Sequence, residues 1–136
     1  MGTRSRIGIQ LKDGSILSSY HHWDGYPEWL GRILTTHYNS REQAAELIDG
    51  GDMSSCWSDS VWGKPHADGR KYGPETYADR GEDCPPRLDD NIEKYLTNGE
   101  EYGYIFENGE WKCYDTKDWS DTYKEQISIP EGALAV

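Results

Sequence analysis

Two dipeptides of the Asx-Gly type, each between short alternating runs of apolar and polar residues, restrict most strongly what this chain can fold into. Asn-Gly and Asp-Gly tolerate the positive φ angles of a two-residue β-turn, so each dipeptide predicts a tight β-hairpin. The clearer hairpin turns at Asn108-Gly109, and its register places Phe106 opposite Trp111. The sequence therefore predicts a sheet that contains two local antiparallel pairs of strands.

The same reasoning predicts a type I′ turn at Asp13-Gly14, near the N-terminus. The register that such a turn imposes places Ile7 opposite Tyr20. Strand alternation then divides the side chains of this hairpin between a buried face and an outer face. The buried face holds Ile7, Ile9, Ile16, Tyr20 and His22, and the outer face holds Arg6, Gln10, Leu17, His21 and Trp23.

Apolar residues recur at helical spacing in three segments, over about 27–38, 41–49 and 88–97. The first segment has an apolar stripe of Leu30, Ile33, Leu34 and His37 or Tyr38, and the second is expected to bury Ala44, Ala45, Leu47 and Ile48. The Ser-Arg-Glu-Gln sequence from Ser40 fits a capping box at the start of the second segment. A short strand is expected near 75–80. Together these elements predict an α+β fold, with an antiparallel sheet of four or five strands from two β-hairpins and about three helices packed on one face.

The length of 136 residues favours one domain, so we expect a single α+β domain over 1–136. The stretch 52–75 mixes Gly, Pro, Asp and Ser with aromatic residues and follows neither period, which predicts a long loop. Weak periodicity over 118–136 predicts a loosely ordered tail. No signal peptide or membrane-spanning apolar run is evident, so a cytoplasmic location is expected.

The formal net charge of −11 is spread unevenly along the chain. Residues 1–41 carry five basic and three acidic groups, whereas the remaining residues carry nine basic and 22 acidic groups. A body this acidic is repelled by nucleic acid and by anionic membranes, but is attracted to basic protein surfaces. We therefore expect no direct contact with nucleic acid or membrane. Solubility alone is the plainer explanation of the charge.

Residue types that serve in metal binding and covalent catalysis are present, but not in a recognisable pattern. Cys56, Cys84 and Cys113 lack the short spacing of a zinc site or a redox dithiol, which favours reduced thiols. No nucleophile elbow and no phosphate-binding Gly-rich loop occurs in the sequence. We therefore expect no catalytic residue, no bound metal and no cofactor.

The junction between the first hairpin and the first helix is the best candidate for a ligand site. It gathers imidazoles, a carboxylate and aromatic rings beside a helix N-terminus, which favours anions. Arginines at the other end of the same strand pair suit a phosphate group. A purely structural role, with Asp24 as a cap and Pro27 in the first helical turn, explains the same residues. Because Asp24-Gly25 follows Trp23 at once, we expect the Trp23 ring to pack beneath this helix. The candidate ligand-binding residues are Arg4, Arg6, His21, His22, Trp23, Asp24 and Tyr26.

Aromatic rings and carboxylates are the candidates for contact with a protein partner. Rings within 52–75 give a large contact area at low entropic cost, and carboxylates complement a basic surface. A solvated turn with an internal ion pair explains the acidic group at 79–83 equally well. The candidate partner-binding residues are Trp57, Trp62, Tyr72, Asp79, Glu82, Glu100, Glu101 and Asp121.

The strand that begins Thr3-Arg4-Ser5-Arg6-Ile7-Gly8 and the turn His22-Trp23-Asp24-Gly25-Tyr26-Pro27 resemble a family of small uncharacterised proteins of tailed phages and prophages. The likeness covers most of 3–115 and is specific over about the first 55 residues. No activity is assigned to that family, so the resemblance carries over no functional residue. It implies an accessory phage protein in the cytoplasm of a bacterial host.

Accessory phage proteins of this size and charge suggest a non-enzymatic inhibitor of a host defence or nucleic-acid-handling complex, of the anti-CRISPR kind. Its partner would be a host protein or ribonucleoprotein complex with a basic surface. A second hypothesis is a small-molecule sponge that sequesters a phosphorylated nucleotide signal. A third is a hydrolase that uses His22, Asp24 and Glu82. The sequence leaves a homodimer open in each case.

Overall fold

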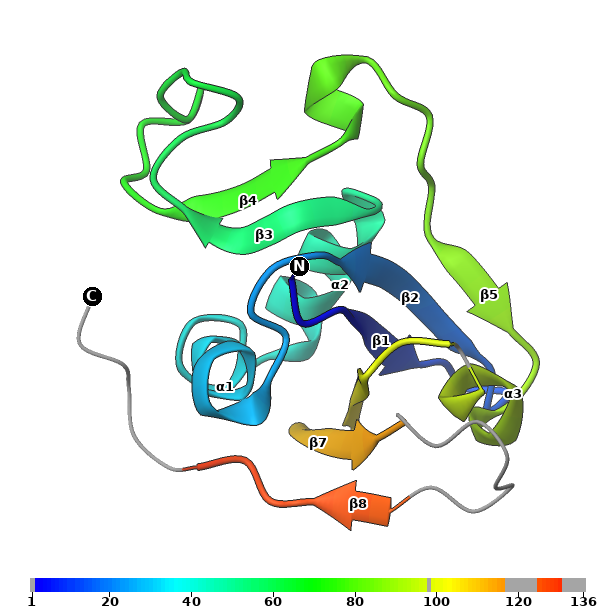
Figure 1. Cartoon of the computed structure of the whole chain (residues 1–136). Coiled ribbons are helices and arrows are strands. Elements are labelled where there is room, and N and C mark those ends of the chain that lie inside the picture. Colours follow the sequence, from blue (N-terminus) through cyan, green and yellow to red (C-terminus); the bar gives the residue numbers. More distant parts are fainter. Residues whose placement is uncertain (1, 98, 117–124, 131–136) are drawn as a thin grey trace.

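The computed structural model describes residues 2–97, 99–116 and 125–130 (Figure 1). In chain order, the elements are β1 (Ser5–Gln10), β2 (Ile16–His21), η1 (Pro27–Gly31), α1 (Arg32–His37), α2 (Arg41–Asp49), β3 (Met53–Ser58), β4 (Gly73–Thr76), η2 (Ala78–Arg80), β5 (Arg87–Asp89), α3 (Ile92–Leu96), β6 (Tyr102–Glu107), β7 (Glu110–Asp115) and β8 (Glu125–Ile127). The α+β class is confirmed.

All strands belong to one mixed sheet with the order β4-β3-β2-β1-β6-β7-β8, while β5 pairs with β2. The two hairpins, β1–β2 and β6–β7, are antiparallel as expected. However, β1 and β6 pair in parallel and thereby join the hairpins, and β2 also pairs in parallel with β3. The prediction of an antiparallel sheet of four or five strands is therefore wrong, because turn chemistry specifies pairing within a hairpin but not between hairpins.

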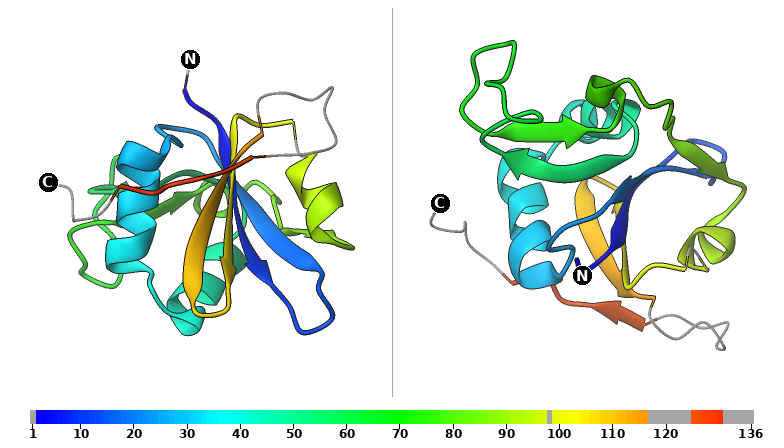
Figure 2. Two further views of the ribbon diagram at one scale, coloured as in Figure 1. Left: turned by 90° about the horizontal axis from the view of Figure 1, so that it is seen from below. Right: turned by 45° about the horizontal axis from the view of Figure 1, so that its top comes forward.

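The helices lie on both faces of the sheet rather than on one (Figure 2). Helices α1 and α2 cover the face that carries Ile7 and Ile9, where the larger apolar cluster is buried. Helix α3 covers the opposite face, where Tyr95 packs with Ile16 and Ile105 in a smaller cluster. The prediction of three helices on one face is therefore wrong for α3, and the central strands are buried on both sides.

The turn at Asp13-Gly14 differs by one residue from the predicted type I′ turn. Only Gly14 has a positive φ, of 89°, and the backbone N–H of Leu11 donates to the carbonyl of Ser15 across a three-residue loop. The Asp13 carboxylate accepts from the N–H and hydroxyl of Ser15, which stabilises this wider turn. Because strand faces alternate, the shift turns Ile16 towards α3 and Leu17 towards the larger cluster.

The second hairpin has the predicted turn and register. Asn108 and Gly109 both have positive φ, of 52° and 80°, and Phe106 lies opposite Trp111. Most of the predicted core is buried as well; Tyr20 and His22 are the exceptions, because both are only half-buried. The confirmed core residues are Ile7, Ile9, Ile16, Leu30, Ile33, Leu34, Leu47, Phe106 and Trp111.

We expect Gly109→Val to lower the free energy of unfolding by more than about 1 kcal/mol, because a β-branched residue resists positive φ. No atom lies within 4 Å of a Cβ added at Gly109, so the cost is one of backbone conformation. Urea denaturation measures it. Gly109→Asn is the matched control, because Asn tolerates positive φ; equal losses in the two variants would contradict this explanation.

The predicted long loop over 52–75 is wrong at both ends, where β3 and β4 form an antiparallel pair with irregular register. The small serines of β3 obscure its alternation in the sequence. In the predicted tail over 118–136, residues 125–127 form β8 on the edge of β7. The rest of that tail, 118–124 and 131–136, lies outside the described residues. Within the described part of the chain, no helix has the length and apolarity needed to cross a membrane.

Candidate functional site

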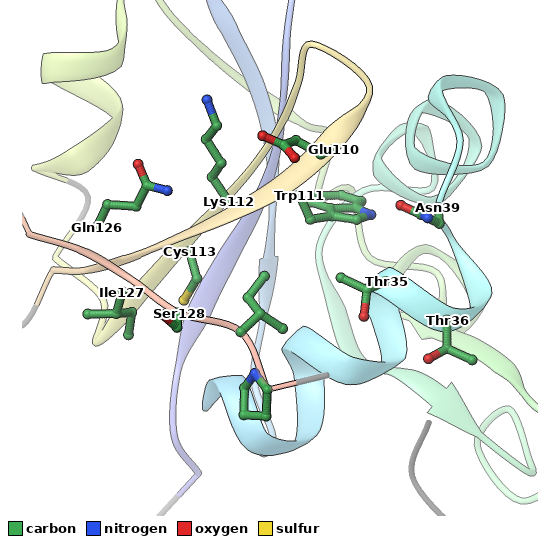
Figure 3. Close-up of a pocket in the computed structure, with 12 residues that line it drawn as sticks. Thr35, Thr36, Asn39, Glu110, Trp111, Lys112, Cys113, Gln126, Ile127 and Ser128 are labelled. Atoms are coloured by element: carbon green, nitrogen blue, oxygen red, sulfur yellow. The ribbon is translucent and has the colours of Figure 1, made fainter. Parts of the chain in front are cut away.

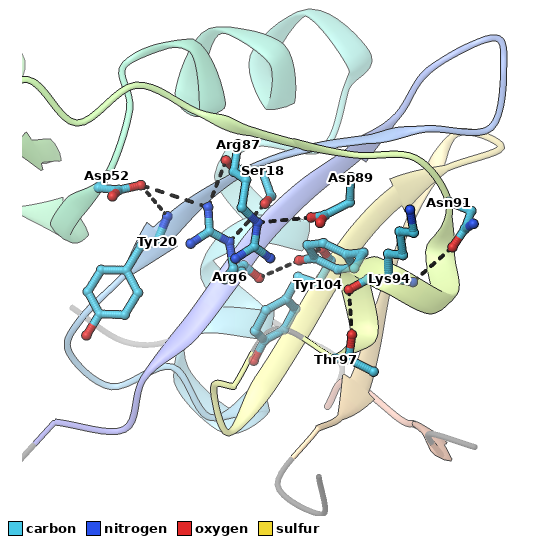
Figure 4. Close-up of polar contacts among 11 residues, drawn as sticks. Arg6, Ser18, Tyr20, Asp52, Arg87, Asp89, Asn91, Lys94, Thr97 and Tyr104 are labelled. Carbon is cyan, nitrogen blue, oxygen red and sulfur yellow. Dashed lines mark hydrogen bonds and ion pairs between the residues drawn. The ribbon is translucent and has the colours of Figure 1, made fainter. Parts of the chain in front are cut away.

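Arg6 and His21, two of the predicted ligand-binding residues, lie on opposite faces of the sheet. Arg6 is buried on the α3 face, where its Nε donates to the Ser18 hydroxyl at 2.9 Å and its Nη2 donates to the Ser18 carbonyl at 3.1 Å (Figure 4). The Asp52 carboxylate lies 4.0 Å from Nη2. Burial, and then the nearby charge of Arg87, lower the pKa of Arg6. This guanidinium is held by the protein itself.

His21 is fully buried on the α1–α2 face, and its Nε2 accepts the backbone N–H of Cys56 at 3.0 Å. Its ring lies near Trp29, with 6.3 Å between the ring centroids. Burial, with a smaller contribution from His22, lowers the pKa of His21 to about 3, so the imidazole is neutral. A fully buried, neutral His21 cannot contact a ligand at the surface.

Trp23 stands outside the core, with 46% of its surface exposed. We expected it to pack beneath the first helix, but β2 ends at His21, and Asp24 turns the chain with a φ of 53°. The Trp23 ring meets His22 edge to face at 4.6 Å, and His22 Nδ1 is 2.6 Å from the Tyr20 hydroxyl. These rings form a surface patch.

The remaining residues of the predicted ligand group have structural contacts. The Arg4 backbone N–H donates to the Glu101 carboxylate at 3.0 Å, and the Arg4 guanidinium lies 3.8 Å from Glu100. Tyr26 precedes η1, whose start carries no side-chain cap, so Asp24 does not cap this helix. The structure thus places Arg4, His22, Trp23 and Tyr26 at or near the surface, whereas the side chains of Arg6 and His21 are buried. Arg4 and Arg6 both lie close enough to Glu100 to lower its pKa, although burial outweighs them.

The predicted acidic cluster at 79–83 is a self-contained turn. The Thr76 hydroxyl donates to Asp79 at 2.9 Å, and Arg80 forms an ion pair with Glu82. The Arg80 guanidinium also lies 4.3 Å from the centre of the Trp62 ring, and the Trp62 indole N–H donates to the Thr76 carbonyl. Trp62 is therefore engaged within its own loop rather than presented as a free anchor.

Trp57 and Tyr72, two predicted partner-binding residues, form an aromatic stack with His37 at the end of α1. The centroids of the Trp57 and His37 rings are 3.9 Å apart, and those of Trp57 and Tyr72 are 5.5 Å apart. Beside this stack lies a cavity of about 330 Å³, which we call the Trp57 pocket. Its lining consists of His37, Tyr38, Gln43, Glu46, Leu47, Trp57, Arg70 and Pro74.

Sequence reasoning missed His37, Glu46 and Arg70 as members of this site. His37 was part of the expected apolar stripe of the first helix, and Glu46 was an unremarked acid of the second. Nothing in their local pattern marks them, because the pocket joins residues of α1, α2 and β3 with the segment that leads into β4.

A larger groove of about 560 Å³ lies between α1 and the β7–β8 pair, and contains none of the predicted site residues (Figure 3). Two of its polar side chains already have partners: the Trp111 indole N–H donates to the Tyr38 carbonyl, and Lys112 forms an ion pair with Glu107. This groove is larger than the Trp57 pocket, but it does not bring the predicted site residues together.

The described residues contain no group of three or more His, Cys, Asp or Glu side chains that could hold a metal ion. Burial raises the pKa of the Cys56 thiol, and also that of Cys84, which keeps both protonated at neutral pH. Two of the three residues proposed for a hydrolase have other partners: His22 contacts Tyr20, and Glu82 pairs with Arg80.

Glu100 and Glu101, the acidic residues just before β6, both contact Arg4. Glu100 lies beside Arg4, and its burial raises the pKa of its carboxyl group, whereas Glu101 accepts the Arg4 N–H. Both are only partly accessible. Asp121 lies outside the described residues.

No protein-family model matches this chain, and no curated protein or solved structure is significantly similar to it. The resemblance to phage and prophage proteins therefore stays a prediction. The fold and the Trp57 pocket define a small α+β protein with an aromatic cavity on an acidic surface.

Proposed function

We propose that this protein is a non-enzymatic binding protein that inhibits a host defence or nucleic-acid-handling complex, in the manner of an anti-CRISPR protein. In this proposal it covers a basic surface of the complex that otherwise holds nucleic acid. The phage origin and the bacterial cytoplasm belong to the same proposal.

One face of α2 carries the observation that best supports this function. Glu42, Glu46 and Asp49, which we call the acidic stripe, are spaced so that they share one side of the helix, and all three are exposed. Within the described residues, none of these three carboxylates takes part in a hydrogen bond or ion pair. Like charges at this spacing destabilise a helix, and acids near its C-terminus oppose the helix dipole.

The fold offsets the energetic cost of the acidic stripe only in part: Glu42 lies in the first turn of α2, where the helix dipole favours an acid, and the charge of Glu46 interacts with that of Arg70. A basic partner surface would offset the remainder, and complementary charge would also speed the encounter. Solubility alone does not require three acids on one side of one helix. The arrangement thus supports electrostatic binding to a protein surface.

We expect the immobilised protein to capture a partner from a bacterial lysate at low salt, and to block nucleic-acid binding by that partner. Affinity should fall as salt rises to physiological strength, mainly through the association rate. The double variant Glu42→Lys/Asp49→Lys should lose the partner. Asp83→Lys/Glu93→Lys makes the same change in net charge elsewhere on exposed positions, and should retain it.

Two results would count against the proposal. If no partner is captured above background at low salt, the proposed inhibitor function is contradicted. Equal losses in the two double variants would show that net charge, rather than the acidic stripe, governs binding.

A further inference from the structure

The Trp57 pocket has walls that are held in place by ring contacts. Trp57 stacks on His37 with an interplanar angle of 16°, and Tyr38 meets Trp57 edge to face at 6.3 Å. The Tyr38 hydroxyl donates to the carbonyl of Cys56, which anchors that ring to β3. A cavity of about 330 Å³ between such walls lies at the small end of ligand sites and has room for a single long side chain.

Arg70, the basic residue of the pocket lining, already has its partner. Its Nε and Nη2 lie 2.6 and 2.5 Å from the Asp68 carboxylate, and this hydrogen bonding raises the pKa of Arg70. A Cβ added at Gly73 would lie 2.5 Å from Arg70 Cδ, so the side chain runs close along the start of β4. An anionic ligand would have to displace Asp68.

Glu46 leaves the pocket with a surplus of negative charge. It forms no hydrogen bond or ion pair with any described residue. Its charge helps to raise the pKa of Tyr38, after burial and Cys56, and that of Arg70, after Asp68. His37 adds no opposing charge at neutral pH, because burial lowers its pKa. The acidic stripe continues from Glu46 along α2.

We infer that the Trp57 pocket receives an arginine or lysine side chain from the basic surface of a protein partner, an inference that rests on the proposed function. The methylene groups of that side chain pack against Leu47 and Trp57, as long basic side chains do on apolar walls. Its charged end meets the Glu46 carboxylate. The pocket thus supplies the central anchor, and the acidic stripe supplies the surrounding charge.

The test uses the full chain, labelled with ¹⁵N, and a blocked pentapeptide, acetyl-Gly-Ser-Arg-Ser-Gly-amide. The comparison peptide carries citrulline, which has nearly the shape of arginine but no charge. We expect a saturable shift of the Trp57 indole N–H with the arginine peptide and none with citrulline. A Trp57→Phe spectrum assigns that resonance among the six tryptophans.

Glu46→Gln should weaken the arginine peptide about tenfold, because it removes a charged hydrogen-bond partner. Glu93→Gln, at an exposed position of α3, makes the same charge change outside both the pocket lining and the acidic stripe, and should leave the titration curve unchanged. No shift at Trp57, or equal effects of the two variants, would overturn the inference.

The outcomes also separate this inference from the proposed function. If the peptide binds in the Trp57 pocket but no partner is captured, the inference about the pocket is supported and the inhibitor function is rejected. If instead capture is lost in Glu42→Lys/Asp49→Lys but persists in Glu46→Gln, and the peptide causes no shift at Trp57, only the inference about the pocket is rejected.

Discussion

Replacing Gly8 by alanine should lower the free energy of unfolding by about 3 kcal/mol, a large effect for the addition of one methyl group. Gly8 lies in β1, at the centre of the sheet and beneath α3. An added Cβ would lie 2.8 Å from Ile16 Cγ2, 3.1 Å from Tyr95 Cζ and 3.2 Å from the Tyr104 carbonyl oxygen. These atoms belong to fully buried residues and have little room to move.

The free-energy cost of Gly8→Ala is raised further because the Tyr95 ring cannot shift freely. Its hydroxyl lies 2.9 Å from the Arg6 carbonyl and 2.7 Å from the Tyr104 carbonyl, and donates to this pair of buried acceptors. Pushing the ring away from Gly8 breaks these contacts in a dry environment, where an unpaired polar group is costly. Overpacking and lost hydrogen bonding therefore act together.

Urea denaturation of Gly8→Ala, Tyr95→Leu and the double variant tests this account. Tyr95→Leu alone leaves a cavity and should also destabilise the fold. In the double variant, the smaller side chain makes room for the new methyl group, so its loss should be less than the sum of the single losses. Strict additivity, or an unperturbed Gly8→Ala variant, would contradict close packing at this position.

The second large effect is a loss of stability in acid that originates at His21. Burial lowers the folded pKa of His21 to about 3, whereas an unfolded histidine titrates near 6.5. Below pH 6.5 the unfolded chain binds a proton that the folded chain does not, so stability falls as the pH drops from about 6.5 to about 3. Above pH 6.5 this contribution is constant and fully favourable to folding.

The hydrogen bond at Nε2 explains why the folded state resists this proton. Nε2 accepts the Cys56 N–H, so protonation would bring two donors face to face inside the core. At pH 5, the shift corresponds to a loss on the order of 2 kcal/mol relative to pH 8. His21→Gln, which keeps an acceptor but does not titrate, should lack this loss.

Unfolding free energies of the two proteins at pH 5 and pH 8 provide the measurement. The difference between the proteins isolates His21 from the many carboxylates that also titrate. Parallel pH profiles for the native sequence and His21→Gln would mean that His21 does not cause the acid sensitivity.

Features that depend on adjacent residues could be predicted from the sequence alone. Asn108-Gly109 has the positive φ angles that its turn needs, and this determines the β6–β7 register. At the start of α2, the Ser40 hydroxyl accepts the Gln43 N–H as the capping box predicts. Most of the core was also predictable, because apolar side chains at helical or alternating spacing have few other places to go.

Local reasoning fails where two turn geometries fit the same dipeptide. The Asp13 carboxylate, by binding Ser15, favours a three-residue loop over the two-residue turn. The three-residue loop shifts the pairing of β1 with β2 by one residue from the predicted register. Ile16 and Leu17 therefore lie on the opposite faces of the sheet from those predicted. The same shift also carried His21 into the core, which removed it from the predicted ligand site.

Only the tertiary structure decided how distant elements meet. The parallel pairing of β1 with β6 joins residues about a hundred positions apart, and the site of α3 follows from the space above Gly8. The Trp57 pocket likewise draws its walls from α1, α2, β3 and the approach to β4. Such contacts depend on closing long loops and burying both faces of one sheet at once, and no short stretch of sequence encodes that balance.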